Sequence, residues 1–367
     1  MKVALLTSSR ADYGIAFPLL KELKSDPFFD LQVIAFGTHL SVKHGETINL
    51  ITRDGFDVSI KVDSMPSGDS PDTISMAMGK TMINFSKVWN ENQFDLIIAI
   101  GDRYEMFAAC ASILPFNIPI AHIHGGETTL GAFDDAFRNS ITHMSSYHFT
   151  TTDTYRKRVI ELKNSDSHVF NVGALSIDNL VSLSLYSIEE FKKKFNIDLS
   201  LPTILITFHP ETVGYQKNKY YINELINSLI KLNNYQLVIT MPNLDTTGNM
   251  IRENLQNFIL KNKNALGIES FGTLGYLSCM KHCTMMLGNT SSGFVEASFF
   301  NKYVINLGDR QKGRITTSNI KNCEIDHVKI ISAVKEYDNF VPNSYDSIYG
   351  DGNSAIKILE ILKNEFT

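Results

Sequence analysis

The chain has 367 residues, of which 43% are hydrophobic and 20% are charged, and its formal net charge is −5 at pH 7. At roughly 150 residues per domain, this length predicts about two folded domains, and the composition excludes a disordered chain. The mild acidity argues against a nucleic-acid-binding protein, which needs a basic face to release counterions. The negative net charge is still compatible with an anionic small-molecule ligand, because a few arginines can bind a phosphate.

Apolar runs and cysteines indicate the cellular setting. The sequence contains no apolar run near the ~20 residues that a membrane-spanning helix needs. The short apolar stretch at the start of the chain fits a buried first strand better than a signal peptide. The four cysteines form no CxxC pair, which argues against a disulfide framework or a zinc site; they are Cys110, Cys279, Cys283 and Cys323. We therefore expect a cytoplasmic protein with reduced thiols and no membrane segment.

The first half of the chain alternates short apolar runs with longer segments of helical period. Strands are predicted at residues 3–7, 31–36, 96–100 and 118–123. Helices are predicted at residues 16–24, 73–89 and 105–114. Strands of almost continuous apolar character are typical of a parallel sheet covered on both faces, and the alternation predicts βαβ units.

The second half repeats this scheme. Strands are predicted at residues 203–208, 236–240, 266–270, 285–287 and 304–307, and helices at residues 223–232, 250–260 and 274–282. The charged segment 182–202 fits a linker helix. We predict an α/β fold of two doubly wound, Rossmann-like domains with parallel sheets and an active-site cleft between them. Ligands of such sheets bind at the carboxyl ends of the strands, so the loops after the strands should carry the chemistry.

Two arginines follow predicted strands of the first half. Arg10 lies among small residues ahead of a helix, where an anion can bind. On its own, this loop is better explained by a capped helix with a surface arginine. Asp102 fits the N-cap of a later helix. Arg103 would share the edge of the sheet with Arg10, and two arginines there would suit a phosphate.

The sequence HIHGGE, at residues 122–127, ends the next strand. Because alternate residues of a strand share a face, His122 and His124 are expected to point the same way. An acid–base role for such a histidine competes with a buried structural role. A metal site would need more ligands than the nearby Glu127, so none is predicted. Asp134 begins a predicted helix, where it either offsets the helix dipole or joins an acid–base cluster.

Polar residues also follow the strands of the second half. His209 comes directly after one strand, and Pro210 favours an extended backbone for it. Residues 288–293, GNTSSG, precede a predicted helix that carries Glu296. Amides and hydroxyls at such a helix start can cradle a phosphate, although a serine-capped helix explains the motif taken alone. Glu296 would lie one turn further on, where it could accept hydrogen bonds from ribose hydroxyls.

Other familiar motifs are missing. The basic loop at residues 308–314, GDRQKGR, lacks the Lys–Ser/Thr pair of a P-loop, so we exclude a nucleoside triphosphatase. The sequence contains no GxGxxG, HExxH or GxSxG motif, which argues against dinucleotide dehydrogenases, zincins and nucleophile-elbow hydrolases.

Six motifs occur in order along the chain. They are SRADYG (9–14), GDR (101–103), HIHGGE (122–127), FHP (208–210), GNTSSG (288–293) and GDRQ (308–311). Together they resemble the UDP-N-acetylglucosamine 2-epimerase family, most closely its hydrolysing branch in bacterial sialic and legionaminic acid synthesis. The sequence YGDG at residues 349–352 extends the match to nearly the whole chain.

The resemblance implies a GT-B-like fold. Its domains would be residues 1–172, joined by a C-terminal helix 352–367, and a UDP-binding domain of residues 173–351. It implies a cytoplasmic homodimer or homotetramer that needs no cofactor and no metal. In the implied reaction the C2 proton of a UDP-N-acetyl sugar is removed while UDP leaves C1. Water then adds to the resulting glycal, which releases a free ManNAc-type sugar and UDP.

The resemblance also implies roles by position. Diphosphate ligands would be Arg10, Arg103, Ser291, Ser292 and Arg310. Glu296 would hold the ribose, with Phe271 and Tyr276 near the uracil. Acid–base or charge-stabilising groups would be Asp102, Asp134, His209 and Glu127. Many members carry glutamate where this chain has His124, so an imidazole would titrate there and move the pH profile toward neutral.

Three other functions stay open at this point. A GT-B glycosyltransferase would need an acceptor, a non-hydrolysing epimerase would keep its product on UDP, and a nucleotide-sugar sensor would bind without turnover. The sugar is also open between UDP-GlcNAc and UDP-diacetylbacillosamine, which differ at C4 and C6. Ala132 and Phe133, in the loop 125–133, favour tolerance of the 6-deoxy sugar.

Overall fold

The computed structural model describes residues 1–367 except 43–44, 66–67, 243–244 and 342–347. Contacts divide the chain into two units. The first comprises Met1–Glu127, Asp134–Ser182 and Ile348–Thr367, and the second comprises Thr128–Phe133 and Leu183–Ser347. From the sequence we expect domain boundaries after residues 172 and 351. In the structure the chain leaves the first unit after residue 182 and returns to it at residue 348.

The first unit is built on a sheet of seven described strands in the order β3-β2-β1-β4-β5-β6-β7, and every described pair in it is parallel. The strands are β1 (Lys2–Thr7), β2 (Asp30–Phe36), β3 (Val58–Val62), β4 (Leu96–Ile100), β5 (Ile120–Ile123), β6 (Tyr147–Thr150) and β7 (Val169–Asn171). The central strands are apolar along their length because both of their faces are covered.

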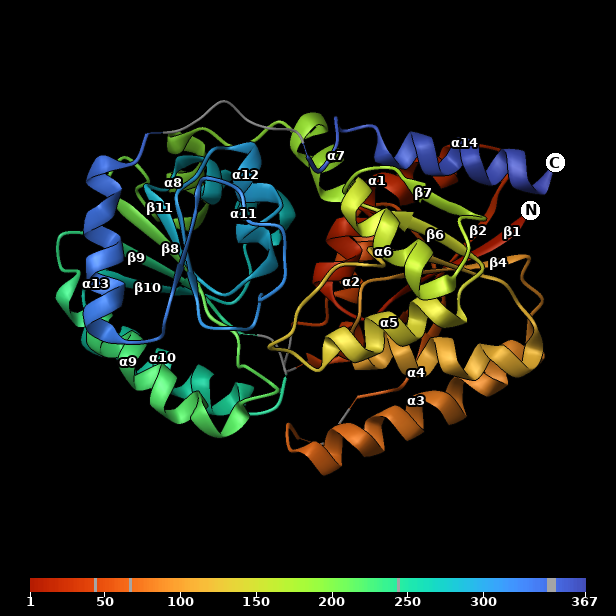
Figure 1. The fold of residues 1–367 in the computed structure, drawn as a ribbon, viewed down its shortest axis with the longest axis horizontal. Coiled ribbons are helices and arrows are strands. Elements are labelled where there is room, and N and C mark those ends of the chain that lie inside the picture. Colours follow the sequence, from red (N-terminus) through yellow and green to blue (C-terminus); the bar gives the residue numbers. More distant parts are fainter. Residues whose placement is uncertain (43–44, 66–67, 243–244, 342–347) are drawn as a thin grey trace. The chain divides into compact units, whose positions relative to one another are not determined.

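Helices cover both faces of this sheet (Figure 1). They are α1 (Arg10–Ser25), α2 (Ile48–Arg53), α3 (Pro71–Glu91), α4 (Tyr104–Ile113), α5 (Asp134–Met144), α6 (Asp153–Lys163), α7 (Leu175–Ser182) and α14 (Ser354–Phe366). On β1, Val3 and Leu5 pack in one core with α1 and α14. The alternate residues Ala4 and Leu6 pack in the other core with α3 and α4.

The second unit repeats this construction. Its described strands are ordered β10-β9-β8-β11-β12-β13, again all parallel. They are β8 (Thr203–Thr207), β9 (Gln236–Thr240), β10 (Ala265–Ile268), β11 (Met285–Gly288), β12 (Val304–Leu307) and β13 (Ile320–Cys323). The helices are α8 (Ile188–Phe195), α9 (Asn218–Lys231), α10 (Gly248–Lys261), α11 (Gly272–His282), α12 (Glu296–Phe299) and α13 (His327–Lys335). Ile204 and Leu205 belong to separate cores on opposite faces of the sheet.

The sequence-based elements are largely confirmed, and most of the strands that the sequence analysis missed share one property. The predicted strands match β1, β2, β4, β5, β8, β9, β10, β11 and β12 to within two residues, and the linker segment contains α8. Three of the four missed strands, β3, β7 and β13, lie at sheet edges. Edge strands expose polar residues, as in the IKNC sequence of β13, so they lack the continuous apolar run used to find the central strands.

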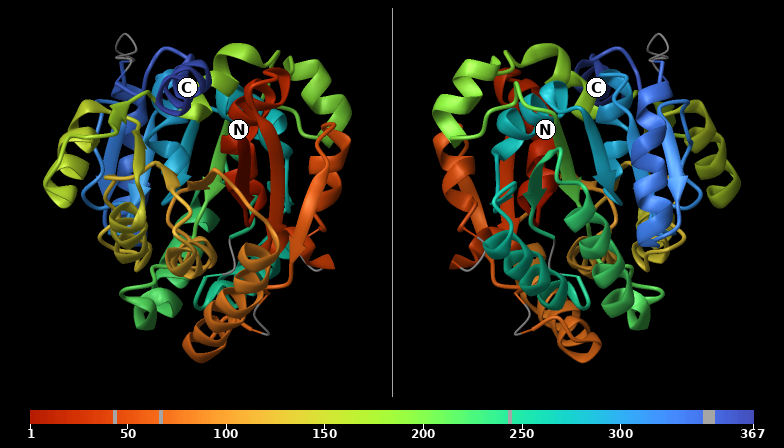
Figure 2. Two further views of the ribbon diagram at one scale, coloured as in Figure 1. Left: turned by 90° about the vertical axis from the view of Figure 1, so that its right-hand side faces the viewer. Right: turned by 90° about the vertical axis from the view of Figure 1, so that its left-hand side faces the viewer.

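The carboxyl-terminal helix α14 belongs to the first unit and lies beside α1 and α7 (Figure 1). The carboxylate of Asp178, on α7, accepts hydrogen bonds from the main-chain N–H groups of Ser354 (3.0 Å) and Ala355 (2.7 Å), at the start of α14. Near the other end of α14, Lys363 pairs with Asp26 at 2.8 Å. The two ends of the chain therefore lie close together (Figures 1 and 2).

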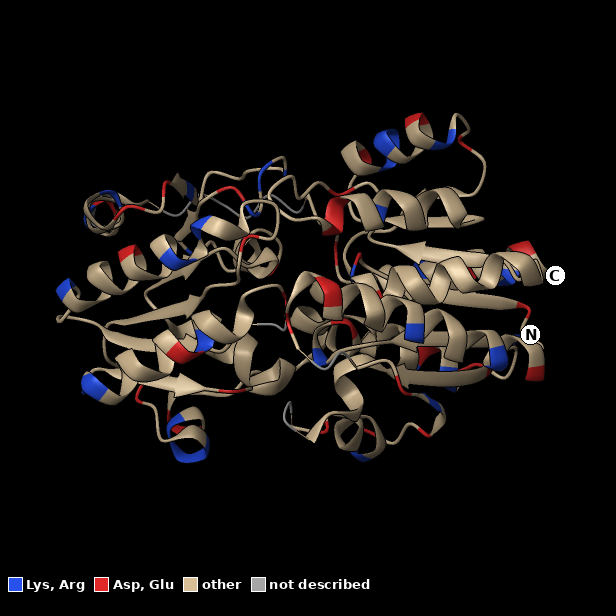
Figure 3. Cartoon of the chain, turned by 90° about the horizontal axis from the view of Figure 1, so that it is seen from below, with Lys and Arg blue, Asp and Glu red and all other residues tan. Residues whose placement is uncertain are grey.

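Charges are mixed over the surface. Segments of Lys and Arg and segments of Asp and Glu both occur on helices of each unit (Figure 3). Within the part of the chain that the structure describes, no helix has both the length and the apolar character needed to cross a membrane.

We expect Asp178→Ala to loosen α14, because the substitution leaves two helix-start N–H groups without their acceptor. The free energy of unfolding should fall by about 2 kcal/mol, the usual cost of losing a buried cap. Urea unfolding followed by circular dichroism measures this change. The control is Asp351→Ala, which removes an exposed carboxylate paired with Lys357 and should change stability little. Equal effects of the two substitutions would contradict the anchoring role of Asp178.

Candidate active site

The candidate residues of the first unit follow three neighbouring strands. Arg10 comes after β1, Asp102 and Arg103 come after β4, and His124 and Glu127 come after β5. Since β1, β4 and β5 are adjacent in the sheet, their carboxyl ends bring these side chains to one edge. Asp134 begins α5, and its side chain is buried.

A buried carboxylate fixes the loop that carries Arg10. Asp12 accepts hydrogen bonds from the N–H groups of Ser8 and Ser9, each at 2.8 Å, and from the Thr7 hydroxyl at 3.0 Å. Ser9 caps α1 in return, with its hydroxyl accepting from the Asp12 N–H. The capped helix expected from the sequence is therefore present. The same network holds the backbone of Arg10 in place at the start of α1.

His124 and Glu127 form a buried pair. His124 follows β5 with a φ of 70°. Its Nδ1 lies 2.8 Å from Oε1 of Glu127, which also accepts a hydrogen bond from the Thr151 hydroxyl at 3.2 Å. Nε2 is buried and has no hydrogen-bond partner among the described residues. The carboxylate assigns the ring proton to Nδ1, which leaves the lone pair on Nε2 to accept a proton.

His122 has a different, structural environment. Its Nε2 lies 2.8 Å from the Gly101 carbonyl oxygen, and its Nδ1 lies 3.1 Å from the Thr142 hydroxyl. Burial lowers the pKa of His122 to about 4, so the ring is neutral at pH 7. His124 lies beyond the end of β5, where its positive φ rather than strand alternation sets its direction. The expectation that the two rings share a strand face therefore does not account for their placement.

Arg138, on α5, was missed as a site residue by the sequence analysis. It is only 3% exposed. Its guanidinium pairs with the carboxylate of Asp102 and donates from Nη1 to the main-chain oxygen of Glu127 at 3.0 Å. Arg138 thus ties the loop after β4 to the loop after β5. The signal in the sequence was an arginine one helical turn after the paired acids Asp134 and Asp135.

Arg103 is already held by a carboxylate. Its Nε and Nη2 each lie 3.2 Å from an oxygen of Glu105, which is buried at the start of α4. This two-point contact orients the guanidinium without a ligand. A role for Arg103 in holding a diphosphate remains a prediction.

The serine loop of the second unit differs from the expected helix start. Ser291–Gly293 form one 3₁₀ turn, and α12 is only four residues long, beginning at Glu296. Such short segments sum few peptide dipoles, so hydroxyls and individual amides are the groups available to an anion. The Ser292 hydroxyl lies 3.2 Å from that of Thr290 and 2.7 Å from that of Tyr276.

The two aromatic candidates, Tyr276 and Phe271, lie in different settings. The hydroxyl of Tyr276 lies within hydrogen-bond distance of the Ser292 hydroxyl. Burial raises the pKa of Tyr276 to about 12, so its side chain stays a neutral phenol. Phe271 packs in the hydrophobic core, with ring centroids 5.3 Å from Phe191 and 4.9 Å from Phe195. Whether either residue contacts a uracil remains a prediction.

The loop after β12 carries Arg310. Two buried acids contact this loop, and the sequence analysis missed both of them. Nη2 of Arg310 lies 3.6 Å from Oδ2 of Asp245, in the loop after β9. Oε1 of Glu211 accepts a hydrogen bond from the main-chain N–H of Asp309 at 2.7 Å. Burial raises the pKa of Glu211. His209, two residues before Glu211, is buried and lies two residues beyond the end of β8.

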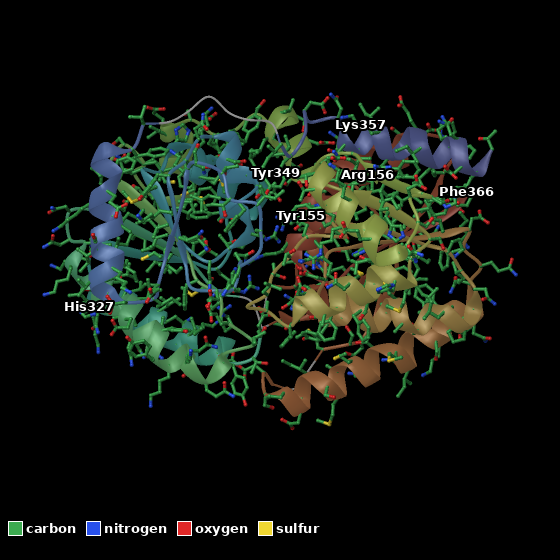
Figure 4. All side chains as sticks on the ribbon, in the orientation of Figure 1. Tyr155, Arg156, His327, Tyr349, Lys357 and Phe366 are labelled. Carbon is green, nitrogen blue, oxygen red and sulfur yellow. The ribbon has the colours of Figure 1, made fainter. Side chains whose placement is uncertain are left out.

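One cluster among the described residues has the composition of a metal site. It consists of Glu224, Asp326 and His327, beside the start of α13 (Figure 4). The Nδ1 of His327 lies 2.7 Å from Glu224, and Asp326 accepts from the N–H groups of Val328 and Lys329. Helix capping accounts for the contacts of Asp326, and Glu224 is hydrogen-bonded to the backbone and ring nitrogens of His327.

Comparison with known proteins identifies the family. The sequence model described as UDP-N-acetylglucosamine 2-epimerase matches residues 21–363, which is most of the chain. The chain belongs to the UDP-N-acetylglucosamine 2-epimerase family. The family resemblance drawn from the six motifs is thereby confirmed.

Two relatives lie in the hydrolysing branch of the family. One is the GDP/UDP-N,N'-diacetylbacillosamine 2-epimerase (hydrolyzing) of Campylobacter jejuni, 35% identical over 88% of this chain and 84% of the relative. The other is the UDP-N,N'-diacetylbacillosamine 2-epimerase (hydrolyzing) of Legionella pneumophila, 30% identical over 99% of this chain and 95% of the relative. These names agree with the branch inferred from the motifs.

The fold also matches solved members of the family. The UDP-GlcNAc 2-epimerase of Methanocaldococcus jannaschii, solved with UDP-GlcNAc and UDP, is 19% identical and superposes with a TM-score of 0.84 over 99% of this chain and 100% of that one. At that identity the likeness concerns the fold alone. The predicted GT-B-like class, with two Rossmann-like parallel-sheet units, is confirmed.

We expect the stability of this family member to fall between about pH 6.5 and pH 4. Burial lowers the pKa of His122 to about 4 and that of His148, its partner on β6, to about 3, from an ordinary value of 6.5. The unfolded chain therefore binds protons in this range that the folded chain does not. The contribution is present above pH 6.5 and is lost as the pH falls, by up to roughly 1.4 kcal/mol per pH unit for each histidine.

Urea unfolding at pH 7 and pH 5 measures this loss. Substituting His148→Gln removes one of these titrations, so the difference between the two pH values should shrink. The control is His143→Gln, because His143 is exposed on α5. An unchanged difference in the His148 variant would contradict the buried neutral state.

Proposed function

We propose that this chain is a hydrolysing 2-epimerase of a UDP-N-acetyl sugar. It would convert UDP-GlcNAc, or its 2,4-diacetamido-6-deoxy analogue UDP-diacetylbacillosamine, to UDP and a free sugar inverted at C2. The observation that carries the proposal is the 35% and 30% identity to relatives named as hydrolysing 2-epimerases, over 88% and 99% of this chain. Both relatives are named for diacetylbacillosamine, which favours the 6-deoxy sugar.

The first step is an elimination. A base takes the proton from C2, the C2–H electron pair forms the C1=C2 bond of a glycal, and the C1–O bond breaks so that its electrons leave with UDP. The Nε2 atom of His124 suits the base, because Glu127 holds the ring proton on Nδ1. A base fixed in one tautomer needs no reorganisation before it accepts the proton.

The second step is the addition of water. Its hydroxyl group adds to C1, and a proton is delivered to C2 on the face opposite to the one first attacked, which inverts C2. We propose Asp102, Asp134 and His209 as the further acid–base or charge-stabilising groups. Arg138 supports this chemistry by holding the Asp102 carboxylate and the Glu127 backbone in register.

The leaving group needs cationic partners, because negative charge develops on the diphosphate as the C1–O bond breaks. We propose five groups for it: Arg10, Arg103, Ser291, Ser292 and Arg310. Glu296 would bind the ribose hydroxyls, and Phe271 and Tyr276 would lie near the uracil. Contacts to Glu105 and Asp245 orient two of these arginines in advance, which lowers the entropy lost on binding.

We also propose the setting of the enzyme. It would act in the cytoplasm without a cofactor or a metal, as a homodimer or homotetramer. Its product would enter the synthesis of a nonulosonic acid of the sialic or legionaminic type. Sedimentation velocity of the purified chain measures the oligomeric state.

Turnover of a UDP-sugar without any acceptor tests the function. In deuterated water we expect free UDP and a free, C2-inverted sugar that carries deuterium at C2. UDP-diacetylbacillosamine should be consumed faster than UDP-GlcNAc. A product still attached to UDP would indicate a non-hydrolysing epimerase, and turnover only with an acceptor would indicate a glycosyltransferase. Protium retained at C2 would overturn the elimination step.

We expect His124→Asn to lower kcat by at least about 100-fold, the usual contribution of a positioned base. UDP affinity should change by less than about threefold, because the imidazole is assigned to the sugar and not to the nucleotide. Steady-state kinetics and UDP calorimetry measure the two effects. The control is His143→Asn on the exposed face of α5, which should keep full activity. Near-normal turnover by the His124 variant would remove His124 from the chemistry.

A further inference from the structure

One buried asparagine holds both main-chain polar groups of His209. Asn289 follows β11 and is fully buried. Its Oδ1 accepts a hydrogen bond from the His209 N–H at 2.7 Å, and its Nδ2 donates to the His209 carbonyl oxygen at 2.8 Å. We call these two hydrogen bonds between Asn289 and His209 the amide clamp. Asn289 reaches His209 from the neighbouring strand, because β11 lies next to β8 in the sheet.

The clamp is itself supported from the next strand. Gln311, in the loop after β12, donates from Nε2 to the main-chain oxygen of Asn289 at 2.9 Å. Its Oε1 accepts a hydrogen bond from Nε of Arg314 at 2.6 Å. All three side chains are buried. A chain of hydrogen bonds therefore runs from Arg314 to His209 and joins the loops after β12, β11 and β8.

A second asparagine repeats the contact two residues along. Asn218, at the start of α9, accepts from the Glu211 N–H at 3.1 Å and donates to the Glu211 carbonyl oxygen at 2.9 Å. Pro210 lies between the two clamped residues and has no N–H to satisfy. The backbone of residues 209–211 is thus held by side-chain amides at both ends. Water molecules could satisfy the hydrogen bonds of this turn. Side-chain amides do more, because they also fix the orientation of its backbone.

We propose that Asn289 is a positioning residue for His209. By holding the N–H and the C=O of that residue together, it fixes the direction in which the Cα–Cβ bond presents the imidazole to the sugar. The inference rests on the proposed function, in which His209 is an acid–base or charge-stabilising group. Asn289 itself touches neither the nucleotide nor the reacting carbons in this account.

The magnitude to expect follows from geometry. Displacing a reacting group by about 1 Å can cost about 100-fold in rate. Asn289→Asp keeps the shape and the acceptor for the His209 N–H, but it places a second oxygen against the His209 carbonyl. We therefore expect kcat to fall by about 10- to 100-fold, whereas KM and UDP affinity stay within about threefold.

The matched control is Asn319→Asp. Asn319 is also buried, with an exposed fraction of 4%, and its Nδ2 donates to the Lys302 carbonyl oxygen at 2.8 Å. It lies at the amino ends of β12 and β13, away from the loops that carry the candidate site. The substitution creates the same oxygen–oxygen conflict, so a similar loss of stability with unchanged kcat is expected. A matching loss of kcat in this control would show that general destabilisation explains the Asn289 result, which would overturn the proposal.

A double-mutant cycle tests whether Asn289 acts through His209. In a His209→Gln background, adding Asn289→Asp should lower kcat by less than about twofold, because the group that it positions is already gone. Two effects that multiply would assign Asn289 a role independent of His209 and overturn the proposal. Should Asn289→Asp not fold, Gln311→Glu removes the support one step further along, and the same non-additivity with His209→Gln is expected.

A readout without turnover separates this inference from the proposed function. NMR of ¹³C,¹⁵N-histidine-labelled protein identifies the His209 ring signal by its loss in His209→Gln. Asn289→Asp, or Gln311→Glu in its place, should shift or broaden that signal, and Asn319→Asp should leave it unchanged. An unmoved His209 signal would overturn the clamp even in an active enzyme. A shifted signal in a chain that turns over no UDP-sugar would instead overturn the proposed function.

Discussion

Main-chain groups just beyond the strand ends need hydrogen-bond partners, and buried polar side chains supply them in this protein. Asp12 binds the N–H groups after β1, Arg138 binds the carbonyl of Glu127, and Asn289 binds both groups of His209. Each of these loops carries a residue proposed to act on the substrate. The architecture of the candidate site therefore depends on side chains that would not touch the substrate at all.

The charged groups follow the same logic. Arg103 and Arg310 each have a carboxylate partner, Glu105 and Asp245 respectively, inside their own unit. A buried charge without a partner is costly, so each arginine compensates the charge of its buried carboxylate and is itself oriented in the absence of a ligand. These pairs also restrict the rotamers that a diphosphate would otherwise have to order. The contacts that stabilise these pairs would therefore also orient the arginines for the proposed diphosphate.

Sequence reasoning reached the central strands and the candidate residues that follow them, because both depend on local patterns. Edge strands such as β3 and β13 escaped it, since their exposed residues interrupt the apolar run. The expected helix after GNTSSG is a 3₁₀ turn and a four-residue helix. Glu211 and Asp245 were missed because their partners lie far away in the sequence, where no spacing rule connects them. The spacing of Arg138 from Asp134 and Asp135 gave a local signal, but it did not point to Asp102, which is 36 residues away.

The amino-acid sequence by itself determined the α/β class, the repeated strand–helix order and the family, because periodicity and ordered motifs are properties of neighbouring residues. Only the tertiary structure decided which neighbours each functional side chain has. It set the tautomer of His124 through Glu127, kept His122 neutral through burial, and gave His209 its amide clamp from Asn289. Those properties depend on distances between loops that parallel strands bring together. Which strands pair cannot be derived from any single segment of the sequence.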